Sequence, residues 1–96
     1  IRKISNEIPS AFSLNQNYPN PFNPITEIEF RLPKLSQVKL SVFNILGKEI
    51  QTIINDKLDA GYYKTEFDGS NYSSGIYFYK IITNEFAETR RMILVK

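Results

Sequence analysis

The stretch from Ile25 to Val42 reads ITEIEFRLPKLSQVKLSV, and apolar and polar side chains alternate on both sides of Pro33. Alternation with a period of two predicts a strand that buries one face. Proline cannot donate a hydrogen bond inside a sheet, so it ends the first run. The stretch therefore predicts two consecutive antiparallel strands, over residues 25–32 and 37–44.

The same pattern recurs along the rest of the chain, with β-branched and aromatic residues filling the apolar positions. Further strands are expected near residues 12–16, 48–54, 62–67, 76–83 and 86–95. Turn residues separate these segments at a spacing of about ten residues, and no segment carries a helical stripe. About seven short strands predict an all-β fold, an antiparallel β-sandwich.

The residues in the turns and at one irregular position predict particular backbone conformations. Gly47, Gly69 and Gly75 are expected to adopt positive φ, and Asn84 is expected to take the left-handed conformation in a tight hairpin. The adjacent pair Ile53-Ile54 interrupts the alternation, which predicts a β-bulge.

Composition excludes several classes of function. The chain has 96 residues, which is the size of one domain, and it has no Cys and no His. A zinc site, and nucleophilic catalysis with a histidine base, therefore lack their usual groups. The net charge of +2 is too small to indicate nucleic-acid or membrane binding. We therefore expect a domain that is not an enzyme and that binds no cofactor and no small-molecule substrate. A calcium site at Asp56, Asp59 and Asp68 would require their oxygens to converge on one point.

The segment 14–24, LNQNYPNPFNP, holds three of the five prolines within six residues. A residue that precedes proline is driven toward extended backbone, so the segment is expected to be a rigid, kinked loop. Phe22 is its one large apolar group and is expected to fix the loop to the core. Residues 1–11 are polar and weakly patterned, which predicts a linker or upstream tail before a domain at 12–96.

This proline segment resembles the opening of the type A C-terminal sorting domains of the type IX secretion system, also called the Por secretion system. The resemblance continues, in order, through residues 38–50, 60–63, 67–69, 74–80 and 91–96. It covers nearly the whole chain and ends on a terminal lysine.

The resemblance implies an Ig-like sandwich that acts as a non-catalytic secretion signal. The implied partners are a cargo on its N-terminal side, the outer-membrane translocon, a shuttle protein and a sortase-like protease that removes the domain. The implied location is the periplasm in transit and then the cell surface or the extracellular space. A cleavage site would lie in or before residues 1–12, where Ser5, Asn6 and Ser10 leave the backbone accessible.

The residues expected to carry the sorting motif match the family segments or the cationic end of the chain. They are Pro19, Asn20, Pro21, Phe22, Asn23, Pro24, Gly47, Gly61, Asp68, Gly69, Ser74, Gly75, Tyr77, Arg90, Arg91 and Lys96. Of these, Arg90, Arg91 and Lys96 are expected to supply the electrostatic part of recognition, and the last strand is expected to pair with a receptor edge.

Two other functions stay open on the residues alone. Tyr62, Phe78 and Tyr72 would form a sugar-stacking platform in a carbohydrate-binding module of a secreted polysaccharide-degrading enzyme. An inert Ig-like spacer is the other alternative. Exposed Ile and Val on an edge strand also predict a tendency toward self-association.

Overall fold

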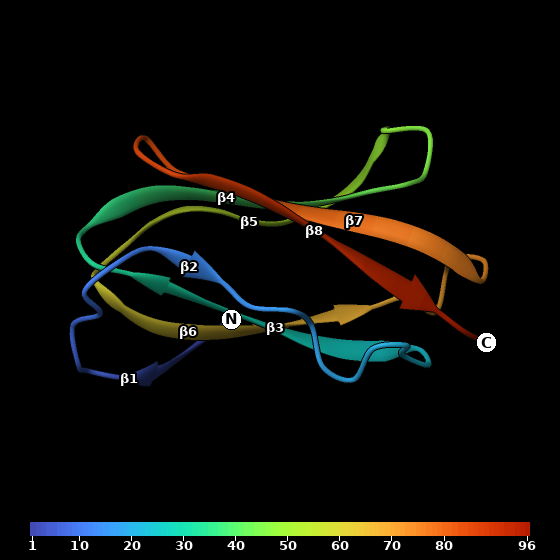
Figure 1. The fold of residues 1–96 in the computed structure, drawn as a ribbon, viewed down its shortest axis with the longest axis horizontal. Coiled ribbons are helices and arrows are strands. Elements are labelled where there is room, and N and C mark those ends of the chain that lie inside the picture. The colour runs from blue at the N-terminus through green and yellow to red at the C-terminus, as the bar shows by residue number, and fades with distance from the viewer.

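The computed structural model describes residues 1–96, and every regular element in it is a β-strand (Figure 1). The strands are β1 (Arg2–Ser5), β2 (Ser13–Leu14), β3 (Ile25–Leu32), β4 (Ser36–Phe43), β5 (Glu49–Leu58), β6 (Gly61–Asp68), β7 (Gly75–Ile82) and β8 (Ala87–Leu94). The fold contains no helix, and hence none that could span a membrane.

The strands form two four-stranded sheets that pack face to face (Figure 1). The strand order is β1-β6-β3-β2 in the first sheet and β5-β4-β7-β8 in the second, and all neighbours run antiparallel. This arrangement confirms the predicted β-sandwich, with eight strands where about seven were expected.

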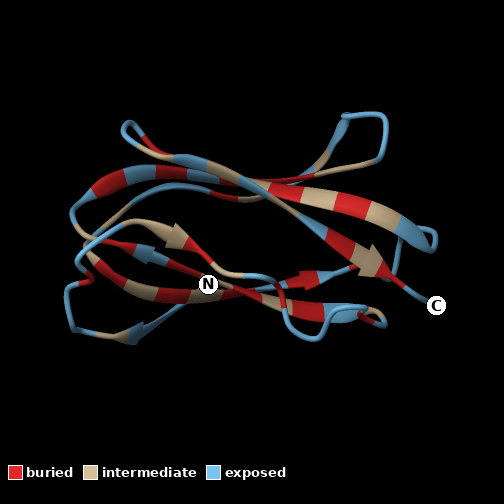
Figure 2. Cartoon of the chain, viewed as in Figure 1, coloured by how far each residue is buried: buried red, intermediate tan, exposed pale blue.

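The core lies between the sheets because one side of each central strand is apolar. Buried and more exposed residues alternate along β3, β6 and β7, and along β4 as far as Leu40, as the banding in Figure 2 shows. Sixteen buried hydrophobic residues form one cluster, in which Phe30 stacks on Tyr63 with ring centroids 5.3 Å apart. A single continuous core of this kind is what a domain without disulfides requires.

The strand β1 was not predicted. Its side chains are exposed or half-buried, so no alternation marks it, and it is held mainly by backbone pairing with the edge of β6. Next to it, the absence of a side chain on Gly61 makes room for Lys3, whose Cε would lie 2.5 Å from a Cβ atom there. The segment 1–11 is therefore partly docked on the sandwich rather than extended away from it.

The bulge predicted at Ile53-Ile54 is confirmed. Leu40 pairs with Ile54 and Ser41 pairs with Thr52, so Ile53 is the extra residue on β5. A second irregularity follows between Val42 and Phe43. Bulges twist an edge strand and weaken its capacity to pair with another chain.

Two turn expectations were wrong. No residue other than glycine has positive φ, so Asn84 is not left-handed; the hydroxyl of Thr83 instead accepts a hydrogen bond from the Glu85 amide at 3.2 Å. Gly69 also lacks positive φ. Its role is close packing, since a Cβ there would lie 3.0 Å from Cδ2 of Leu94 and 3.2 Å from the Pro24 carbonyl oxygen.

Candidate functional site

One end of the sandwich gathers most of the residues that the sequence marks as functional. The proline loop (residues 15–24), the end of β8, the β4–β5 turn and the segment between β6 and β7 all lie at the right-hand end in Figure 1. We call this region the C-terminal end of the sandwich.

The proline loop is bonded directly to the last strand. The amide of Phe22 donates to the Ile93 carbonyl and the amide of Val95 donates to the Phe22 carbonyl, both at 2.9 Å. The side-chain oxygen of Asn20 accepts a bond from the Ile93 amide at 3.0 Å. The outer edge of β8 is therefore covered at this point, and the predicted pairing of this stretch with a receptor edge would require the loop to move.

Phe22 fixes this loop to the core, as predicted. Its side chain is 1% exposed and meets the ring of Phe67 edge-on, with centroids 6.0 Å apart. The neighbouring loop residues Pro19, Pro21 and Asn23 face solvent, and Tyr18 is 79% exposed. One aromatic side chain thus anchors a loop that presents Tyr18, Pro19, Pro21 and Asn23 at the surface.

Asn17 organises the loop from inside, and the sequence analysis missed it. It is 2% exposed, and its side-chain amide donates to the Thr26 hydroxyl at 3.0 Å and to the Pro19 carbonyl at 3.2 Å. The Thr26 hydroxyl donates to the same carbonyl at 2.8 Å. No sequence signal distinguishes Asn17 from the exposed asparagines nearby, because its partners come together only through the fold.

Tyr79 ties the start of this loop to the second sheet. Its hydroxyl donates to the Asn15 carbonyl and accepts a bond from the Asn17 amide, both at 2.7 Å. The side chain is fully buried, and burial raises the pKa of the Tyr79 hydroxyl to about 12. One side chain of β7 thereby satisfies two main-chain groups in the segment that crosses between the sheets.

We expect Tyr79→Phe to lower the free energy of unfolding by about 1–3 kcal/mol at neutral pH, because it leaves two main-chain groups without a partner. The pKa of the Tyr79 hydroxyl is higher in the folded state than its unfolded value of about 10. The neutral hydroxyl therefore contributes fully to the free energy of unfolding below pH 10, and this contribution is lost between about pH 10 and pH 12. The difference in free energy of unfolding between wild type and variant, measured in urea, should therefore shrink over that pH range. A difference that stays constant with pH would contradict this role for the Tyr79 hydroxyl.

The chain terminus is fastened to the turn that follows β6. The amide of Lys96 donates to the Ser74 hydroxyl at 2.9 Å, and its ammonium group donates to the Ser70 carbonyl. Hydrogen bonds from Ser70, assisted by the positive charge of Lys96, hold the pKa of the Asp68 carboxyl below its usual value. Asp68 therefore caps this turn.

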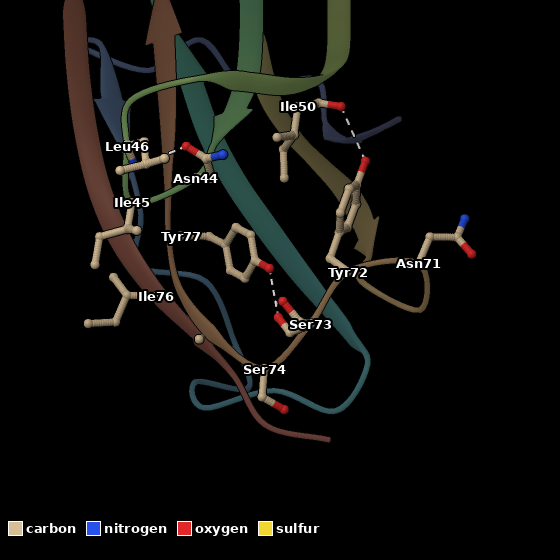
Figure 3. A pocket seen from close by; sticks show the side chains of 11 residues that line it. Asn44, Ile45, Leu46, Ile50, Asn71, Tyr72, Ser73, Ser74, Ile76 and Tyr77 are labelled. Carbon is tan, nitrogen blue, oxygen red and sulfur yellow. Dashed lines mark hydrogen bonds between the residues drawn. The ribbon is translucent and has the colours of Figure 1, made fainter.

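A pocket of about 670 Å³ opens at the same end of the sandwich (Figure 3). Ile45 and Leu46 line it from the β4–β5 turn, and Ile76 and Tyr77 line it from β7. Ile45 is 66% exposed and Leu46 is 89% exposed, so the apolar surface continues out of the pocket. Apart from the tyrosine hydroxyls, its polar groups are neutral amides and serine hydroxyls, which offer no acid–base pair for catalysis.

Apart from Arg90 and Arg91, the sixteen predicted site residues fall into two groups. The C-terminal end brings together Pro19, Asn20, Pro21, Phe22, Asn23, Pro24, Gly47, Asp68, Gly69, Ser74, Gly75, Tyr77 and Lys96. Gly61 lies at the opposite end of β6, where it accommodates Lys3.

The two arginines of β8 differ in role. Arg90 donates to the Leu14 carbonyl at 2.6 Å and forms an ion pair with Glu88 at 2.9 Å, so it links the edges of the two sheets. Arg91 takes the opposite parity of the strand and is exposed. A role for Arg90, Arg91 and Lys96 in recognition stays a prediction.

The three aromatic residues of the predicted sugar-stacking platform do not lie on one surface. Tyr62 lies on the first sheet and Phe78 on the second, each at the parity that points away from the core. Tyr72 packs between Phe67 and Tyr77 instead of extending either surface. The three rings therefore form no common plane, and no three acidic side chains converge as a calcium site would require.

The sequence matches one family of known domains, the secretion system C-terminal sorting domains, over residues 16–96. No curated protein and no solved structure gives a significant match. The matched range includes the proline loop from Gln16 onward, the pocket and the terminal lysine. The chain belongs to the type IX secretion system C-terminal sorting domain family.

Proposed function

We propose that this domain is the non-catalytic signal that the outer-membrane translocon of the type IX system reads on an exported cargo. The cargo would lie on the N-terminal side, cross the periplasm, meet a shuttle protein and arrive at the cell surface or outside the cell. The observation that carries the proposal is the family match over residues 16–96, joined to the gathering of the motif residues at one end.

The geometry suits a signal that is read as a folded surface. The proline loop, the last strand and the terminal lysine are linked by main-chain and side-chain hydrogen bonds. A rigid surface loses little conformational entropy when a receptor binds it. The function thus needs no group with acid–base or nucleophilic chemistry.

Processing by a sortase-like protease is the second part of the proposal. Between β1 and β2 the residues Asn6, Glu7, Ile8, Ser10 and Ala11 are all exposed and lie outside any strand, whereas Ser5 is paired with β6. Proteases cut most readily where the backbone is exposed and unpaired. We therefore propose a cut at 6–8 or 10–11, on either side of the buried Pro9, or upstream of residue 1, rather than within β1.

The test is a reporter protein joined ahead of residue 1 and expressed in a host with a type IX system. The reporter should reach the surface or the medium, and it should stay inside an otherwise identical host that lacks the translocon. Mass spectrometry of the released reporter should find its C-terminus near residues 6–11 or before residue 1. Equal export from both hosts would refute the signal, and a surface reporter that keeps residues 12–96 would refute processing.

A further inference from the structure

The outward side of β7 and β8 combines apolar and cationic side chains. Because Tyr77, Tyr79, Ile81, Met92 and Leu94 point into the core, the other parity of the two strands points outward. We define the β7–β8 outer face by these outward residues: Ile76, Phe78, Lys80, Ile82, Ala87, Thr89, Arg91 and Ile93. Five of the eight are apolar, two are cations and none is acidic.

The two cations on this face have no acidic partner. The four ion pairs of the structure use the cations Lys34, Lys39, Lys64 and Arg90. Lys80 and Arg91 are absent from all four, although both stand beside half-buried apolar side chains; Arg91 is opposite Phe78 in the strand register. A partner that covered this face would need carboxylates to offset the desolvation of the cations.

The outward side of the other sheet has a different character. On β3 and β6 it consists of Ile25, Glu27, Glu29, Arg31, Tyr62, Lys64, Glu66 and Asp68. Four of these eight are carboxylates and only Ile25 and Tyr62 offer large nonpolar surface. The apolar and cationic character is therefore specific to one side of the sandwich and is not a general property of its surface.

The apolar surface of this face continues into the pocket at the C-terminal end. Ile76 belongs to both, and beyond it lie the exposed side chains of Ile45 and Leu46 (Figure 3). Contiguous exposed apolar surface that ends in a concavity is typical of a protein-binding site.

We propose that the β7–β8 outer face docks on a protein of the secretion machinery whose surface combines apolar side chains with carboxylates. The inference rests on the proposed function. It identifies which face of the domain the secretion machinery binds and the kind of surface that binds it. Arg91 and Lys80 direct the encounter and set the register, and Ile76, Phe78 and Ile93 supply the buried contact.

A second copy of the chain fits this face less well. The same face on another copy would bring cations against cations, and the acidic outer face of β3 and β6 has little apolar surface to match. An anionic lipid surface also fits less well, because two cations contribute only about 1 kcal/mol each and Ile76, Phe78 and Ile93 are half-buried on a sheet.

The experiment measures the exported fraction of a reporter joined to residues 1–96, with Arg91→Glu and Lys80→Glu as separate variants. Each should lower that fraction at least about fivefold, because charge reversal opposes the carboxylates of the partner. Lys57→Glu is the matched control: Lys57 is an exposed cation on β5, in the same sheet, and its reversal should leave export within about twofold. Urea midpoints near wild type for all three variants would establish that they fold.

The outcomes separate the two claims. If the wild-type fusion is exported and Arg91→Glu and Lys80→Glu match it, the docking face is refuted while the sorting function stands. If the wild-type fusion is not exported, the function fails and the docking face fails with it. Two further results would refute docking on a protein of the secretion machinery. One is binding of the domain to phosphatidylglycerol vesicles that Arg91→Glu abolishes. The other is dimerisation in sedimentation equilibrium that Arg91→Glu abolishes.

Discussion

Replacing Phe22 with alanine is expected to lower the free energy of unfolding by about 3–5 kcal/mol. The side chain is 1% exposed and packs edge-on against Phe67, so its removal leaves a cavity between the proline loop and the core. A domain of this size has a total stability of about 5–15 kcal/mol, so this loss is a large share of the total. Urea unfolding followed by circular dichroism measures the loss.

Tyr18→Ala is the matched control for Phe22→Ala. It removes an aromatic ring from the same loop, but Tyr18 is 79% exposed and only its main chain pairs, with Glu27. Its effect should stay within about 0.5 kcal/mol. Equal losses for the two variants would show that Phe22 does not anchor the loop in the way described.

Deleting residues 92–96 is expected to unfold the domain. The deletion removes Met92 and Leu94, which are 0% and 1% exposed, and it takes away the main-chain partners of Phe22. Two large core side chains are worth about 4–10 kcal/mol together, which is comparable to the whole stability of the domain. The truncated chain should lose its cooperative urea transition.

Removal of Lys96 alone is the control for this truncation. It breaks only the bonds to the Ser74 hydroxyl and the Ser70 carbonyl and should cost about 1 kcal/mol or less. A truncated chain that still unfolds cooperatively near the wild-type midpoint would contradict the account. If the prediction holds, lost export after truncation does not by itself identify Lys96 or its neighbours as receptor contacts, because the fold is lost as well.

The strands were predictable because most of them bury one face and expose the other. Alternation located β3, β4, β6 and β7 closely, and the break at Ile53 located the bulge in β5. The alternation failed for β1, whose pairing with β6 involves main-chain groups that carry no sequence pattern.

The candidate site was predictable only in part. The resemblance marked the proline loop and the terminal lysine, and Phe22 was identified as the one large apolar group among the prolines. Asn17 and Tyr79 could not be found in this way, because their partners lie nine and more than sixty residues away along the chain. Likewise, only the strand register separates Arg91 on the outer face from Arg90 at the sheet edges.

The central claim is that a folded surface, and not a linear sequence, is the sorting signal. The most direct test is the exported fraction of a reporter joined to residues 1–96 carrying Ile28→Asp, normalised to total reporter. Ile28 is fully buried in β3, outside the segments that carry the family resemblance, and a carboxylate there would have no partner in the core. Glu29→Ala, at the next position on the outward side, is the control. The account predicts that Ile28→Asp abolishes export while Glu29→Ala preserves it, and export of the Ile28→Asp fusion at the wild-type level would contradict it.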